Sequence, residues 1–159
     1  MADELTDERQ SNEPVDEKKT GGLTDEQIAA EEEFLKGIPR FNLGAFVMPA
    51  IWGPAHGFWV AILYYPIWLL ADNVLYNAYE QQTAFAIVIA VLVILILIAI
   101  TLAFALVSQP LAAHKAVDKG KTKEQYVARE RIWTVVCVVI GIVFIAIATW
   151  YNLDVRPTL

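Results

Sequence analysis

Three long stretches without charge constrain this chain more than any other feature. Residues 41–71, 81–109 and 132–153 contain no Asp, Glu, Lys or Arg, although charged residues make up 19% of the 159-residue chain. A helix needs about 20 apolar residues to cross the hydrocarbon core of a bilayer, and each stretch is long enough. The sequence therefore predicts an all-α integral membrane protein. The same stretches exclude a soluble enzyme domain and a nucleic-acid-binding protein. A disulfide-rich secreted module is excluded because the chain has one cysteine.

The first 40 residues form a separate acidic segment, which holds 12 of the 18 acidic residues. Residues 1–23 are polar and lack apolar periodicity, so they cannot bury enough surface to offset the entropy of ordering. We expect a disordered, cytoplasmic N-terminal tail over residues 1–40. Thr24 and Gln27 have the spacing of a capping box, which predicts a short helix at about residues 25–36. This helix would either rest on the membrane surface or stay loose.

Prolines interrupt the first apolar stretch of the membrane domain, which we place at residues 41–151. An interior proline removes a backbone donor and clashes one turn back. We therefore expect a short helix over residues 43–52, lying in the interface or re-entering the membrane, and a break at Gly53-Pro54. A first transmembrane helix would follow at about residues 55–75, bent near Pro66.

The other two spans are simpler. Residues 84–107 and 132–151 are apolar throughout, apart from a few hydroxyl groups. Thr122 and Gln125 form a second capping box, so a helix should begin at about Lys123 and continue into the last span. A basic loop over residues 108–131 would connect the two, and residues 152–159 would form a short polar tail.

The distribution of positive charge predicts the orientation. Lys and Arg are retained on the cytoplasmic side of a membrane. The loop over residues 108–131 has six of them, whereas residues 72–83 have none. We therefore predict a multi-pass protein of the plasma (cytoplasmic) membrane with a cytoplasmic N-terminus and an extracytoplasmic C-terminus.

Two motifs resemble a group of small bacterial membrane proteins to which no activity is assigned. The first is Phe41-Asn42-Leu43-Gly44-Ala45-Phe46, then Pro49, Ile51-Trp52-Gly53 and His56-Gly57-Phe58-Trp59. It is similar to that group's FNWGAF…PxxWG…HGxW box, with Leu43 where the group usually has Trp. The second is the run from Glu124 to Trp133, which looks like the group's E-x-[FY]-x-x-x-[QE]-R-x-W entry into the last span. The resemblance covers roughly a quarter of the chain, leaves out the acidic tail, and implies only a membrane architecture.

The first motif supplies the candidate functional residues. His56 is the only side chain in the first apolar stretch that titrates near neutral pH, and an ionisable group inside a membrane is a functional candidate by default. The alternative, which we favour, is an interfacial histidine that bonds a backbone group freed by Pro54. Asn42 is a plausible helix N-cap. Trp52 and Trp59 complete the set, because amphipathic rings favour the headgroup level.

The basic loop supplies candidates for contact with anionic lipid headgroups, which attract juxtamembrane cations. These candidates are Lys115, Lys119, Lys121, Lys123, Arg129 and Arg131. The alternative is that these charges only determine the topology.

No motif in the sequence indicates catalysis. The chain lacks the spacing of a zinc site, a phosphate-binding loop or a dinucleotide-binding signature. We therefore expect a non-enzymatic membrane component, without cofactor or metal, that packs against a second copy or another membrane protein and binds no nucleic acid. The alternative is a small transporter or channel subunit that exposes the broken helix around Gly53 and His56 to a solute.

Overall fold

The computed structural model describes Gly22 and residues 24–158. The chain divides into two compact parts, residues 1–37 and residues 38–159. The predicted disorder of the N-terminal tail concerns residues 1–21 and 23, which lie outside the described residues. Within the described ranges the chain is helical and contains no strand.

The described residues of the first part form the helix α1 (Asp25–Leu35). The Thr24 hydroxyl accepts a hydrogen bond from the Gln27 amide, and the Gln27 side chain accepts one from the Thr24 amide. This capping box starts the helix where the sequence predicts it. No residue of α1 is buried.

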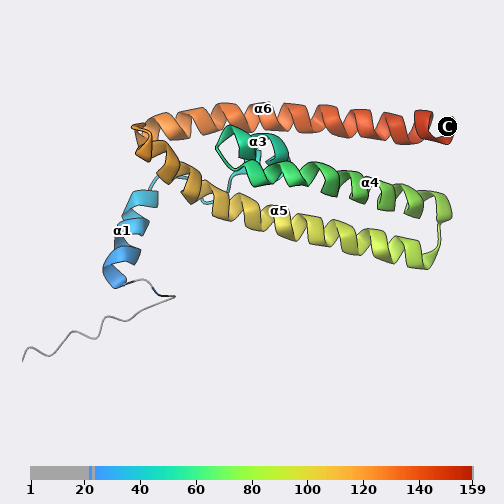
Figure 1. Ribbon diagram of the computed structural model, residues 1–159, viewed down its shortest axis with the longest axis horizontal. Coiled ribbons are helices and arrows are strands. Elements are labelled where there is room, and N and C mark those ends of the chain that lie inside the picture. Colours follow the sequence, from blue (N-terminus) through green and yellow to red (C-terminus); the bar gives the residue numbers. More distant parts are fainter. Residues whose placement is uncertain (1–21, 23, 159) are drawn as a thin grey trace, which may run out of the picture. The chain divides into compact units, whose positions relative to one another are not determined.

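The second part is built on three helices that are long and apolar enough to cross a membrane. The first is a short 3₁₀ helix, η1 (Trp59–Leu63), that leads directly into α4 (Tyr64–Gln81). The others are α5 (Ala84–Asp118) and α6 (Lys123–Trp150). Figure 1 shows α4, α5 and α6 alongside one another with alternating chain direction. The protein is therefore an all-α, multi-pass membrane protein.

The first span differs from the prediction of residues 55–75. The preceding helix ends near Gly57, whose φ of 83° breaks it, so the span begins only at Trp59. Pro66 lies in the first turn of α4, where the missing N–H leaves no intrahelical bond unmade. At the other end α4 extends beyond the predicted end of the span at about residue 75, through the polar residues 76–81, and stops at Gln82 in the left-handed conformation.

The predicted basic loop over residues 108–131 is also wrong in its extent. The helix α5 passes through Pro110 and ends at Asp118. Packing holds the helix together on both sides of the proline, where the buried residues are Ser108, Gln109, Ala112 and Ala113. The connection is then a tight turn at Gly120, which has a φ of 77°. The tail also differs, because η2 (Tyr151–Val155) and η3 (Arg156–Thr158) extend α6 nearly to the end of the chain.

The segment predicted as one helix over residues 43–52 forms two, α2 (Leu43–Val47) and α3 (Pro49–Ala55). Pro49 occupies the first position of α3, and a residue before proline is driven out of the helical region. Met48 accordingly has a φ of −136° and a ψ of 64°. Figure 1 shows α3 between α6 and the α4–α5 pair. Because Trp52 is fully buried, the segment is packed inside the protein rather than lying on its surface.

Candidate functional site

Three polar side chains of the broken segment point into the space between α5 and α6. Asn42 is the N-cap of α2, where its side-chain oxygen accepts a hydrogen bond from the Ala45 amide at 2.8 Å. Trp52 and His56 follow on α3, and their four-residue spacing places them on one helix face. Their rings stack with centroids 4.1 Å apart. The break between α2 and α3 therefore brings all three side chains to one side.

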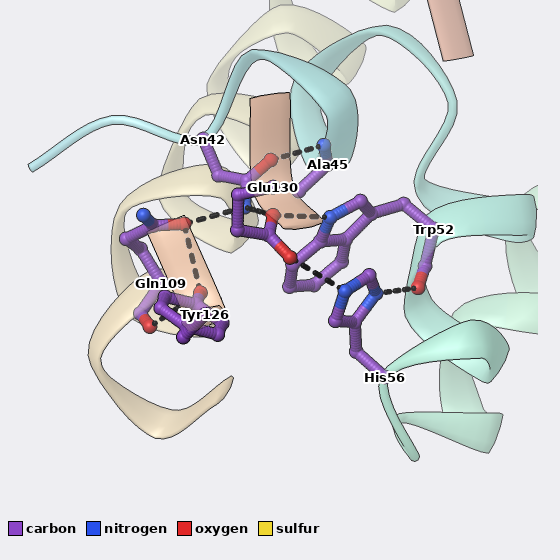
Figure 2. Close-up of polar contacts among 7 residues, drawn as sticks. All are labelled: Asn42, Ala45, Trp52, His56, Gln109, Tyr126 and Glu130. Atoms are coloured by element: carbon purple, nitrogen blue, oxygen red, sulfur yellow. Dashed lines mark hydrogen bonds and ion pairs between the residues drawn. The ribbon is translucent and has the colours of Figure 1, made fainter. Parts of the chain in front are cut away.

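Glu130 on α6 joins these three groups, as Figure 2 shows. One carboxylate oxygen, Oε2, accepts hydrogen bonds from Asn42 Nδ2 at 2.8 Å and from Trp52 Nε1 at 2.9 Å. The other, Oε1, lies 2.6 Å from His56 Nε2. The side chains of His56 and Glu130 are 7% and 9% exposed. We call Asn42, Trp52, His56 and Glu130 the polar clamp, because they tie the broken segment to α6.

Gln109 and Tyr126 extend the clamp to the end of α5. Asn42 Nδ2 also donates to Gln109 Oε1. The Tyr126 hydroxyl lies 3.3 Å from both the side-chain and the backbone oxygen of Gln109. Gln109 and Tyr126 are 3% and 2% exposed. The network thus connects α2, α3, α5 and α6 through hydrogen bonds in a region with little water.

The geometry fixes the number of protons shared by His56 and Glu130. His56 Nδ1 lies 2.8 Å from the Trp52 carbonyl, and a carbonyl can only accept, so Nδ1 carries a proton. The 2.6 Å contact between Nε2 and Oε1 requires one further proton between them, since two lone pairs would repel. That proton can sit on either partner, so either an imidazolium faces a carboxylate or an imidazole faces a carboxylic acid. The pair has no net charge in either form, which suits a membrane interior.

The clamp lacks the ligands of a metal site. A metal site needs a group of at least three His, Cys, Asp or Glu side chains, and the described part of the chain has no such group. His56 and Glu130 instead lie against each other, with Nε2 2.6 Å from Oε1. Together with Gln109 and Tyr126, the clamp holds α2, α3, α5 and α6 together.

Three of the four candidate residues from the first motif meet in this site, and one does not. His56, Asn42 and Trp52 are members of the clamp, whereas Trp59 lies in η1 and is 69% exposed. His56 bonds the Trp52 carbonyl, rather than a group freed by Pro54 as the favoured interpretation proposed. Its contact with Glu130 was not expected from the sequence.

The sequence prediction missed Glu130, Gln109 and Tyr126 because it assigned residues 108–131 to a basic connection between two spans, although it expected a helix from about Lys123. A signal for them exists. In a helix that begins at Lys123, Tyr126 and Glu130 are four residues apart on one face, and Trp133 follows three residues later. That ring meets His56 edge-on, with centroids 5.5 Å apart. The two motifs that carry the resemblance therefore converge on one site.

Four of the six basic candidates surround a small cavity beside the clamp. Its volume is about 50 Å³. His56 and Tyr126 of the network also line it. Lys115 contacts the broken segment directly, because its Nζ donates to the Gly57 carbonyl at 3.2 Å and lies 3.8 Å from the centre of the Phe58 ring. The basic members of the lining are Lys115, Lys119, Lys121 and Arg129, whereas Lys123 and Arg131 are not among them.

A larger groove opens between α4 and α6 in the apolar part of the molecule. Its volume is about 490 Å³, and most of its lining side chains are apolar. Its lining includes Val47, Met48, Trp68, Thr101, Ile145 and Ala148. The broken segment therefore forms part of the groove wall, and the clamp that fixes this segment also shapes the groove.

A second polar cluster closes the groove at the other end of the helices. Asp72 lines the groove and accepts a hydrogen bond from Asn152 Nδ2 at 2.6 Å. Arg156 Nη1 lies 3.6 Å from the Asp72 carboxylate, and Nη2 donates to Asn73 Oδ1 at 2.6 Å. The guanidinium also lies 3.8 Å from the centre of the Tyr76 ring. This cluster joins the end of α6 to the middle of α4.

Comparison with known proteins does not identify a family for this chain. The chain has no significant match among protein-family models, curated proteins or solved structures. The clamp, the groove and the basic cavity are the features of the structure that bear on its function.

Proposed function

We propose that this protein is a non-enzymatic, partner-binding component of a membrane. In this proposal the polar clamp has a structural role, and the groove between α4 and α6 accepts a transmembrane helix from a second copy of the chain. The observation that carries the proposal is the open apolar groove, which adjoins a polar site whose groups are already paired.

The pairing within the clamp argues against catalysis. A general base or acid must reach a proton of the substrate. Both oxygens of Glu130 and both ring nitrogens of His56 instead face other groups of the chain. The Asn42 side-chain oxygen is likewise used to cap α2. These commitments support a site that holds helices rather than one that acts on a substrate.

The groove also favours binding over transport. A solute path needs polar groups along its length. Irregular backbone supplies such groups at membrane depth only where it lines a cavity and is not covered by protein. The backbone groups at the break are bonded within the chain: the Phe58 amide donates to the Gly53 carbonyl at 2.8 Å, and the Gly57 amide donates to the Pro54 carbonyl at 3.1 Å. The groove itself is mainly apolar. These features favour an apolar occupant over a transported solute.

Symmetry points to a second copy as the occupant. Twofold dimers are the commonest oligomers, and two copies with the same orientation in a membrane can be related by an axis along its normal. Such an axis brings the same residue of each copy to the same depth. Ile145 and Ala148 line the groove from α6 and are exposed, and a small residue such as Ala148 on such a face lets helices approach closely. We therefore place α6 of each copy in the groove of the other.

Cysteine cross-linking in membranes tests this arrangement. Cys137 is the only cysteine, so a Cys137→Ala background allows single reporters. Ile145→Cys, in the groove, should form a disulfide-linked dimer on mild oxidation, because the two residues would lie close to the twofold axis. Non-reducing electrophoresis measures the dimer.

Val143→Cys is the matched control, since Val143 lies at nearly the same depth on the opposite face of α6 and is 49% exposed. It should stay monomeric under the same conditions. Equal cross-linking of the two variants, or none from Ile145→Cys, would reject the second copy as occupant.

A further inference from the structure

We infer that the basic cavity beside His56 is a binding site for a phosphate group. This inference is independent of the groove and of its occupant. Lys115 lies in the last turn of α5 and Lys119 is its C-cap, Lys121 lies in the turn after α5, and Arg129 reaches the cavity from α6. The packing of α5 against α6 therefore gathers four cationic side chains around one opening.

The charge balance of the cavity calls for an anion. Its lining contains no Asp or Glu. Within residues 24–158, Lys119, Lys121 and Arg129 form no ion pair in the structure, and Lys115 contacts a carbonyl and a ring instead of a carboxylate. The Glu130 carboxylate lies behind His56 and is already used by the clamp. Four like charges repel one another across so small a space, and a bound anion would remove this cost.

The size and chemistry of the cavity fit a single phosphate. One water needs about 10–15 Å³ of such space, so a cavity of about 50 Å³ holds a small polyatomic anion. Lys binds phosphate as a point charge, and Arg donates to two of its oxygens at once. His56 also lines the cavity, but both of its ring nitrogens face other groups of the chain, so the lysines and the arginine would supply the donors to the anion.

The position of the cavity allows two sources of phosphate. It lies at the ends of α5 and α6, next to the apolar stretches, where anionic phospholipid headgroups are found. A soluble phosphate could also enter from the aqueous side. The shared chemistry is the phosphate group, and an experiment with both ligands distinguishes the sources.

Lipid binding to the full-length protein tests the inference. The protein is reconstituted in phosphatidylcholine nanodiscs, phosphatidic acid is titrated in, and binding is followed by native mass spectrometry. Lys119→Gln/Arg129→Gln should weaken binding of phosphatidic acid by at least about tenfold, because two of the four cations are lost. Inorganic phosphate is then added to the wild-type protein as a competitor of phosphatidic acid. Competition identifies a soluble source of the phosphate group, and its absence identifies the lipid.

Lys123→Gln/Arg131→Gln is the control, since it removes the same charge from the same segment outside the cavity. It should change binding by less than about threefold. Equal losses in the two double variants would show a diffuse electrostatic surface and overturn the inference, as would equal retention of phosphatidic acid by wild type and Lys119→Gln/Arg129→Gln.

Discussion

Replacing Glu130 with alanine should lower the free energy of unfolding by about 3–5 kcal/mol, the usual cost of removing one partner from a buried charged pair. The substitution would leave the Trp52 and Asn42 donors and the His56 ring without their acceptor in a buried site. The broken segment should then separate from α6. Unfolding by SDS in mixed micelles measures the change.

Two further variants make this result specific. Glu124→Ala removes an exposed carboxylate from the first turn of the same helix and should change stability by no more than about 1 kcal/mol. Glu130→Gln should lose much less than Glu130→Ala, because the amide oxygen can accept from Trp52 and Asn42 while the amide nitrogen donates to His56 Nε2. If Glu130→Ala were as stable as Glu124→Ala, the clamp would not hold the fold.

Gly53→Leu should lower the free energy of unfolding by about 3 kcal/mol, the upper part of the range for overpacking. A Cβ on Gly53 would overlap the Cβ of Ala61 and lie 3.0 Å from the Phe58 carbonyl oxygen. Neither group can move as a flexible side chain does, so α3 and η1 would have to separate. The same unfolding assay measures the loss.

Ala99→Leu is the control for this second prediction. Ala99 lies on an exposed face of α5, where a larger apolar side chain meets only lipid, and the change should stay within about 0.5 kcal/mol. A Gly53→Leu protein as stable as Ala99→Leu would show that the close approach of α3 and η1 does not limit the packing.

The helical architecture follows from features that the sequence displays directly. Uncharged stretches long enough for a bilayer predict three spans, and the structure has three helices of that kind. The caps are equally local, because Thr122 and Gln125 need only their own spacing to start α6. Asn42 is also an N-cap, as its position before an apolar run suggests.

The clamp could not be predicted in the same way, because its members come from distant helices. Trp52 and Glu130 are 78 positions apart. Counting Glu130 with the charges of a basic loop made it look solvated, although the face of α6 that carries it continues through Cys137 and Gly141, both buried. The early end predicted for the second span has a similar cause: the packing that carries α5 through Pro110 comes from other helices, whereas an interior proline by itself disfavours a helix.

The coupling between His56 and Glu130 is the most direct test of the central claim, which is that the buried contact between these two side chains fixes the broken segment to α6. A double-mutant cycle compares His56→Ala, Glu130→Ala and the double variant by their free energies of unfolding. The structure predicts a coupling energy of at least about 1.5 kcal/mol, within the range for contacting residues in one network. Losses that add to within about 0.5 kcal/mol would contradict the claim, since independent residues could not form the clamp.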